Sequence, residues 1–116
     1  MLNSSPLNTP EARRAGAILT IDLDALAANW KRYSQLAGAS KSEAAAVVKA
    51  GSYGLDAARA APALAHAACK TFYVATLEQC IALRVVLGSS PAIHVFHGLM
   101  DGAGQAFTEH RPVPCL

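Results

Sequence analysis

The sequence predicts an α/β fold built on a parallel sheet. Short apolar segments that begin near residues 45, 71, 92 and 113 alternate with stretches of helical periodicity. Each apolar segment is nearly continuous rather than alternating with polar residues, as expected for strands that helices cover. The regular spacing indicates βα units that follow one another along the chain.

The composition describes a small globular protein. Of 116 residues, 53% are hydrophobic and 16% charged, and the net charge is +2. The sequence has no basic cluster of the kind that binds nucleic acid, since Arg13-Arg14 in the polar N-terminal leader is far short of one. No apolar segment is long enough to span a membrane. Residues 1–16 form a polar leader that we expect to be disordered, and its lack of an apolar core argues against a signal peptide. We therefore expect a cytoplasmic protein whose three cysteines are reduced.

The first elements precede the regular alternation. Residues 17–23 read as a strand, after which Asp24 can cap a helix. Leu26 and Trp30 begin the apolar stripe of this helix, which Gly38 is well placed to end. We thus expect a leading strand and helix before the first βα unit.

The next unit carries a lysine at the end of its strand. Residues 44–50 form an apolar run that reads as a buried strand ending at Lys49. Pro62 is awkward within the helical stretch that follows, because proline is best tolerated in a first turn. We therefore predict a helix over about residues 61–68.

Local signals define the remaining elements. Thr76 and Gln79 fit a capping box that opens a helix, and Gly88 ends it. Two further strands are predicted at residues 70–76 and 91–98. A short helix is predicted at residues 101–110, and the beginning of another strand at residues 112–116.

Lys49 is the candidate functional residue. In parallel α/β folds, groups at the carboxyl ends of strands form the active site. A lysine there can form a Schiff base with a carbonyl cofactor. The alternative is a lysine that ends a strand and simply reaches solvent.

Four blocks of sequence resemble the N-terminal part of alanine racemase in order and spacing. They are IDLDAL, AVVKAGSYG, APALAHAACKTFYVATLEQCIALR and HVFHGL, and the resemblance covers residues 17–116. It implies a partial parallel (β/α) barrel of the TIM type, with about the first three βα units after the leading strand and helix. Residues 17–116 would then be the incomplete N-terminal portion of a barrel domain that binds pyridoxal 5′-phosphate.

The resemblance also implies roles for two residues. Lys49 would hold the cofactor covalently and act as one of two acid/base groups, and Tyr53 would hydrogen-bond the cofactor phosphate. The alternative for Tyr53 is an amphipathic surface tyrosine. Where the family motif has Asn or Asp followed by Ala, this chain has Gly51 and Ser52, and Asp56 stands where glycine is usual. Gly51 adds backbone freedom beside the lysine.

The implied function is the interconversion of L-alanine and D-alanine for peptidoglycan synthesis by a homodimer. In the family, the second base is a tyrosine that comes from the other subunit and lies beyond residue 116. We therefore expect the chain to be a truncated N-terminal piece that is inactive alone. Two alternatives are a non-catalytic module that binds pyridoxal phosphate and a poorly folded piece with open sheet edges.

The histidines do not predict a metal site. His94 and His97 are three residues apart around a strand and tend to face opposite sides, while His66 and His110 fall on helical stretches. A metal site needs several converging ligands. We therefore expect no metal.

Overall fold

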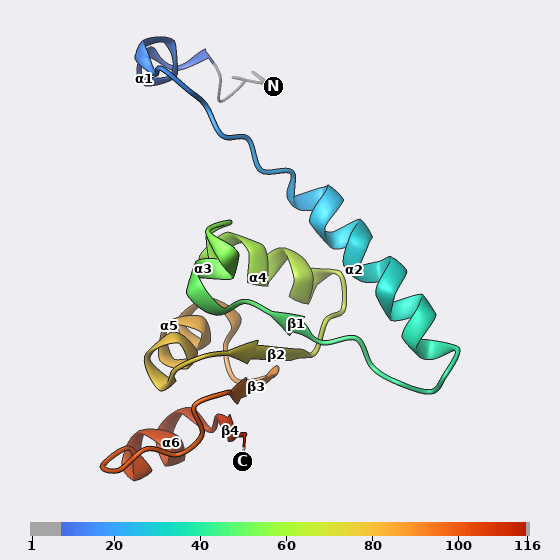
Figure 1. The fold of residues 1–116 in the computed structure, drawn as a ribbon, viewed down its shortest axis with the longest axis vertical. Helices are drawn as coiled ribbons and strands as arrows, with labels where there is room; N and C mark the ends of the chain where they lie inside the picture. The colour runs from blue at the N-terminus through green and yellow to red at the C-terminus, as the bar shows by residue number, and fades with distance from the viewer. Residues whose placement is uncertain (1–7, 116) are drawn as a thin grey trace.

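The computed structural model describes residues 8–115, which form two N-terminal helices followed by four strands that alternate with helices (Figure 1). The strands are β1 (Ala46–Val47), β2 (Thr71–Val74), β3 (Ala92–Val95) and β4 (Val113–Pro114). The helices are α1 (Pro10–Arg14), α2 (Leu23–Gly38), α3 (Lys49–Tyr53), α4 (Ala57–His66), α5 (Leu77–Leu87) and α6 (Gly104–His110).

The strands form one parallel sheet in sequential order. β1 pairs with β2, β2 with β3, and β3 with β4. In the register, Val47 lies opposite Tyr73, and Tyr73 lies opposite His94. Sequential parallel strands joined through helices agree with the partial barrel of the TIM type that the resemblance implies.

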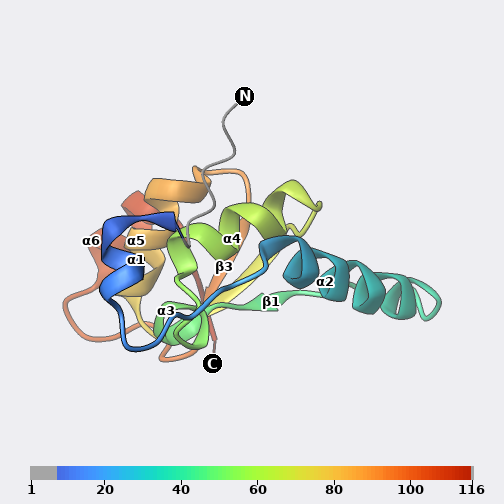
Figure 2. The same cartoon turned by 90° about the horizontal axis from the view of Figure 1, so that it is seen from above.

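The core lies between the sheet and the helices on one side of it. α4 and α5 lie on the same side of the strands (Figure 2). Alternate strand residues point toward them and are almost fully buried, namely Phe72, Val74, Ile93 and Val95. The intervening residues of β2 and β3 face the side that these helices leave uncovered.

The predicted leading strand is wrong. Residues 17–22 belong to no strand, and the side chains of Ile18 and Leu19 are 50% and 78% exposed. A strand needs a partner for its backbone hydrogen bonds, and no other described segment pairs with this one. The cap prediction is also wrong, because Asp22 accepts the hydrogen bond from the backbone N–H of Ala25.

The helix predicted over residues 61–68 begins earlier, at Ala57, and Pro62 lies inside it. Asp56 caps this helix by accepting a 3.1 Å hydrogen bond from the backbone N–H of Ala58. The alanine-rich sequence and this cap support a helix even though Pro62 lacks the donor for one intrahelical bond.

The later elements agree with the predictions. The Thr76–Gln79 capping box opens α5, and Gly88 caps its end. Of the leader that we expected to be disordered, residues 1–7 lie outside the described residues, whereas residues 10–14 form the helix α1, which Thr9 caps and which has no buried residue. Residue 116 of the last predicted strand also lies outside them. No helix within residues 8–115 has the length and apolar character needed to cross a membrane.

Candidate functional site

Lys49 lies at the carboxyl end of β1, the edge of the sheet from which the chain enters α3 (Figure 1). β1 is shorter than predicted, but the ladder continues one residue further, where the N–H of Val48 donates to the carbonyl oxygen of Tyr73 at 2.9 Å. Lys49 is the next residue and is half-buried. The predicted placement of Lys49 at a strand end is therefore correct.

The segment after Lys49 is a left-handed turn. Ala50, Gly51, Ser52 and Tyr53 have φ angles of 51°, 64°, 57° and 55°. The N–H of Ser52 donates to the carbonyl oxygen of Val48, and the N–H of Gly54 donates to that of Ala50. These bonds have the four-residue spacing of a helical turn, so residues four apart come to the same side.

This turn brings the two predicted site residues together. The Nζ of Lys49 lies 5.9 Å from the centre of the Tyr53 ring. Tyr53 is 65% exposed, so its hydroxyl is open to a ligand. Within residues 8–115, no carboxylate lies within ion-pair distance of Lys49. An amine without a carboxylate partner beside an accessible phenol is a donor set that fits a carbonyl group and an anionic phosphate.

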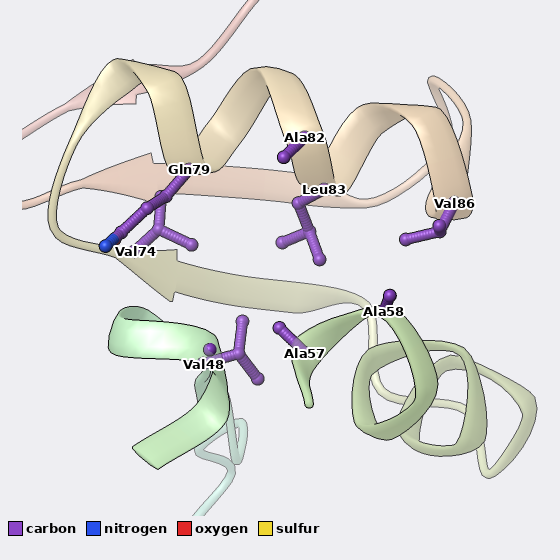
Figure 3. A pocket seen from close by; sticks show the side chains of 9 residues that line it. Val48, Ala57, Ala58, Val74, Gln79, Ala82, Leu83 and Val86 are labelled. Carbon is purple, nitrogen blue, oxygen red and sulfur yellow. The ribbon is translucent and has the colours of Figure 1, made fainter. Parts of the chain in front are cut away.

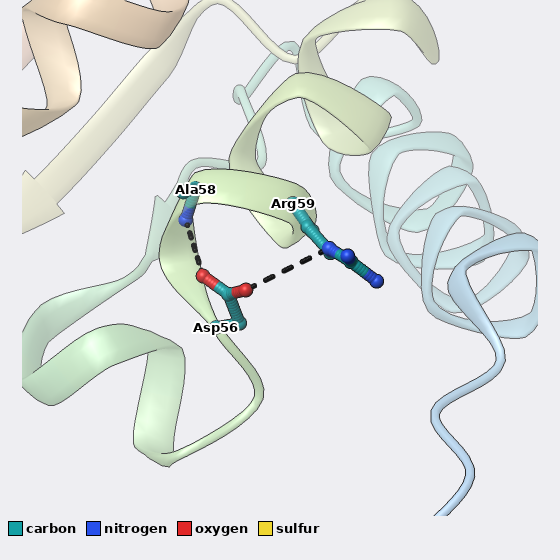
Figure 4. Close-up of polar contacts among 3 residues, drawn as sticks. All are labelled: Asp56, Ala58 and Arg59. Atoms are coloured by element: carbon teal, nitrogen blue, oxygen red, sulfur yellow. Dashed lines mark hydrogen bonds and ion pairs between the residues drawn. The ribbon is translucent and has the colours of Figure 1, made fainter. Parts of the chain in front are cut away.

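The three positions that depart from the family motif, Gly51, Ser52 and Asp56, all have positive φ. Gly51 has a φ of 64°, in the region that glycine adopts at little cost. Asp56 has a φ of 68°, and its carboxylate accepts from the N–H of Ala58 and pairs with Arg59 at 3.8 Å (Figure 4). The glycine therefore suits the turn, and local polar contacts hold the aspartate.

The turn backs onto an apolar cavity of about 160 Å³ on the helix-covered side of the sheet (Figure 3). Gly51 is part of its wall, together with Val48, Ala57, Val74 and Leu83. No atom lies within 4 Å of a Cβ added at Gly51. Backbone conformation rather than a lack of space therefore makes glycine suitable here.

An aromatic cluster on the uncovered side of the sheet was not predicted from the sequence. The Tyr73 ring stacks on His94 at 4.5 Å between centroids and on Phe96 at 5.3 Å. The signal in the sequence is alternation, because Tyr73 and His94 each stand between two buried strand residues. Phe96 follows β3 at the same end of the sheet as Lys49, so the cluster borders the candidate site.

Comparison with known proteins connects this geometry to a family. The sequence profile described as alanine racemase, N-terminal domain, matches residues 21–116. The alanine racemase of Cereibacter sphaeroides strain ATCC 17029 is 54% identical over 102 residues, which are 88% of this chain and 29% of the relative. The alanine racemase of Dinoroseobacter shibae is 47% identical over the same shares of the two proteins.

A solved structure agrees with these relatives. The crystal structure of alanine racemase from Bartonella henselae with covalently bound pyridoxal phosphate is 36% identical, with a TM-score of 0.75. The match covers 81% of this chain and 26% of that protein. The chain thus spans less than a third of the length of the relatives it matches. The matched profile covers most of the chain, and the protein therefore belongs to the alanine racemase N-terminal domain family.

Proposed function

We propose that residues 17–116 are the cofactor-anchoring part of an alanine racemase, which interconverts L-alanine and D-alanine with pyridoxal 5′-phosphate. The observation that carries the proposal is the position of Lys49 at the carboxyl end of β1, with its Nζ 5.9 Å from the Tyr53 ring centre. The similarity to the Bartonella henselae protein, whose structure contains covalently bound pyridoxal phosphate, supports it. The reaction takes place in the cytoplasm and supplies D-alanine for peptidoglycan.

Each residue has a separate task in this proposal. Lys49 holds the cofactor covalently through its ε-amine and, when released from that bond, moves a proton at the α-carbon of alanine. Tyr53 donates a hydrogen bond from its hydroxyl to the cofactor phosphate. Bound pyridoxal phosphate supplies an electron sink for the α-carbon.

Racemisation needs proton transfer on both faces of the α-carbon. Lys49 can serve one face only, because its side chain reaches the substrate from the end of β1. We propose that the group for the other face comes from the second subunit of a homodimer.

Reductive trapping tests cofactor binding. The chain is incubated with subsaturating pyridoxal 5′-phosphate and reduced with borohydride, and the modified lysines are identified by peptide mass spectrometry. We expect the modification at Lys49 to exceed that at the three other lysines, and to be lost in Lys49→Ala but retained in Lys70→Ala. Equal modification of Lys31, Lys41, Lys49 and Lys70 would contradict the proposal.

A chimera tests the reaction itself. Residues 17–116 replace the matching segment of the Cereibacter sphaeroides alanine racemase, and formation of D-alanine from L-alanine is followed by chiral chromatography. We expect activity in the chimera and in its Lys70→Ala variant, and none in its Lys49→Ala variant. An active Lys49→Ala chimera would exclude the catalytic role of this lysine.

A further inference from the structure

The turn between Lys49 and Tyr53 is energetically unusual. Five consecutive residues, Ala50 to Gly54, have positive φ, a conformation that non-glycine residues adopt at a cost. Gly51 lies inside the turn and Gly54 ends it, so the cost falls only on Ala50, Ser52 and Tyr53. A Cβ added at Gly51 would have nothing within 4 Å, so a lack of space does not explain the glycine. The turn needs Gly51 for its backbone conformation.

The exit of the turn is held differently. The Asp56 carboxylate accepts a 3.1 Å hydrogen bond from the N–H of Ala58 through Oδ1, and its Oδ2 lies 3.8 Å from the Nε of Arg59 (Figure 4). The ion pair is between exposed side chains and is weak, so the backbone hydrogen bond is the main contact. It joins the end of the turn segment to the first turn of α4.

We propose that Gly51 and Asp56 are positioning residues that together set the separation of the Lys49 amine and the Tyr53 hydroxyl. Gly51 allows the left-handed turn, and Asp56 holds its exit to α4. The two functional side chains are thereby presented on one side of the turn, with the Lys49 Nζ 5.9 Å from the centre of the Tyr53 ring, where they can meet a ligand that carries both a carbonyl and a phosphate. The identity of this ligand rests on the proposed function, whereas the geometry of the turn is independent of it.

The first test measures the geometry without a ligand. In the 116-residue chain, a nuclear Overhauser effect between the Lys49 ε-methylene and the Tyr53 ring protons reports their proximity. Gly51→Ala is compared with Gly88→Ala, which places a methyl at the end of α5 with nothing within 4 Å; Gly88 has a φ of 73° and a ψ of −159°, a conformation almost restricted to glycine, so this control is at least as strained. We expect the effect to disappear in Gly51→Ala and to persist in Gly88→Ala, although both variants lose stability.

The second test measures the consequence for ligand binding, by trapping pyridoxal 5′-phosphate on Lys49 over a range of concentrations. We expect Gly51→Ala and Asp56→Ala each to raise the pyridoxal 5′-phosphate concentration at which trapping is half-saturated by about tenfold. Asp56→Asn keeps the oxygen that caps α4 and loses the ion pair, so it should remain within about twofold of the parent, because exposed ion pairs contribute little.

A rescue variant separates positioning from misfolding. Ala50→Gly combined with Gly51→Ala moves the glycine by one residue within the same turn, and we expect it to restore both the Lys49–Tyr53 contact and the affinity. The inference is overturned if Gly51→Ala keeps the contact and the affinity, or if Gly88→Ala loses both to the same extent. If the parent chain shows the contact but does not trap the cofactor preferentially on Lys49, the proposed function fails and the geometric inference stands.

Discussion

The Nε of Arg84 donates a 2.9 Å hydrogen bond to the carbonyl oxygen of His110, the last residue of α6. The two Nη atoms of the same guanidinium donate to the carbonyl oxygens of Gly88, Pro91 and Arg111. One side chain of α5 thereby joins the end of its own helix, the start of β3 and the end of α6. Its planar set of donors satisfies carbonyl groups that the helix ends leave free.

We expect Arg84→Lys to lower the free energy of unfolding by about 1–3 kcal/mol, because an ammonium group cannot reproduce four hydrogen bonds in a plane. Urea unfolding followed by circular dichroism measures the change. The control is Arg59→Lys, since the Arg59 side chain is 80% exposed and has only a long ion pair with Asp56. Equal effects of the two substitutions would show that the hydrogen bonds of Arg84 add no stability.

The indole of Trp30 fixes α2 to the chain that leads into β1. Its Nε1 donates a 3.1 Å hydrogen bond to the carbonyl oxygen of Ala44, and the ring packs against the core. Trp30→Phe should lower the free energy of unfolding by about 1 kcal/mol through loss of this bond. Tyr33→Phe on the same helix is the control, because Tyr33 is 68% exposed. A stability loss confined to Tyr33→Phe would contradict the assignment.

The capping box at the start of α5 provides a third prediction. Thr76 Oγ1 accepts from the N–H of Gln79, whose Oε1 accepts from the N–H groups of Ala75 and Thr76. Thr76→Ala leaves a helix donor without its partner, so we expect a stability loss of about 1 kcal/mol. The control is Thr108→Ala, because the Thr108 hydroxyl only donates to a carbonyl in the exposed part of α6. The prediction fails if both variants unfold at the same urea concentration.

The buried thiols make stability depend on alkaline pH. Burial raises the pKa of Cys69 and of Cys80 above the usual thiol value. The nearby Glu43 charge adds to the rise for Cys69, while Arg84 opposes it for Cys80. The folded chain therefore keeps both protons at a pH at which the unfolded chain releases them.

The sign of the pH effect follows from linkage. The stabilisation is fully present below the unfolded thiol pKa of about 8.5 and is lost as the pH rises through the raised folded values. The free energy of unfolding, measured from pH 7 upward, should fall once the pH exceeds the unfolded thiol pKa. The fall should be shallower in Cys80→Ala than in the parent. A slope that is the same in Cys80→Ala would rule out this cause.

Much of the fold was predictable because its signals are local. The capping box at Thr76 and the glycine at position 88 define α5 within a few residues of sequence, and the apolar runs of β2 and β3 need no distant information. The position of Lys49 at the end of an apolar run is also a local signal. Its strand-end placement follows from the alternation of strands and helices alone.

The prediction for residues 17–23 failed because a strand is not a local property. Ile18 and Leu19 have the composition of a strand, but a strand forms only where another segment supplies the hydrogen-bonding edge. The helix at Ala57 differed for a related reason, since the Asp56 cap and the packing of α4 outweigh the local signal of Pro62.

The sequence by itself determined the alternation of strands and helices from β1 to β4, the family resemblance and the two candidate site residues. Only the tertiary structure decided how Lys49 and Tyr53 are brought together. Gly51 permits a positive φ, but it does not require one at the three non-glycine residues beside it. The left-handed turn exists because the β1–β2 ladder holds its start and the capped α4 holds its end. The Tyr73–His94 stack likewise depends on strand register, which brings together residues that are distant in sequence.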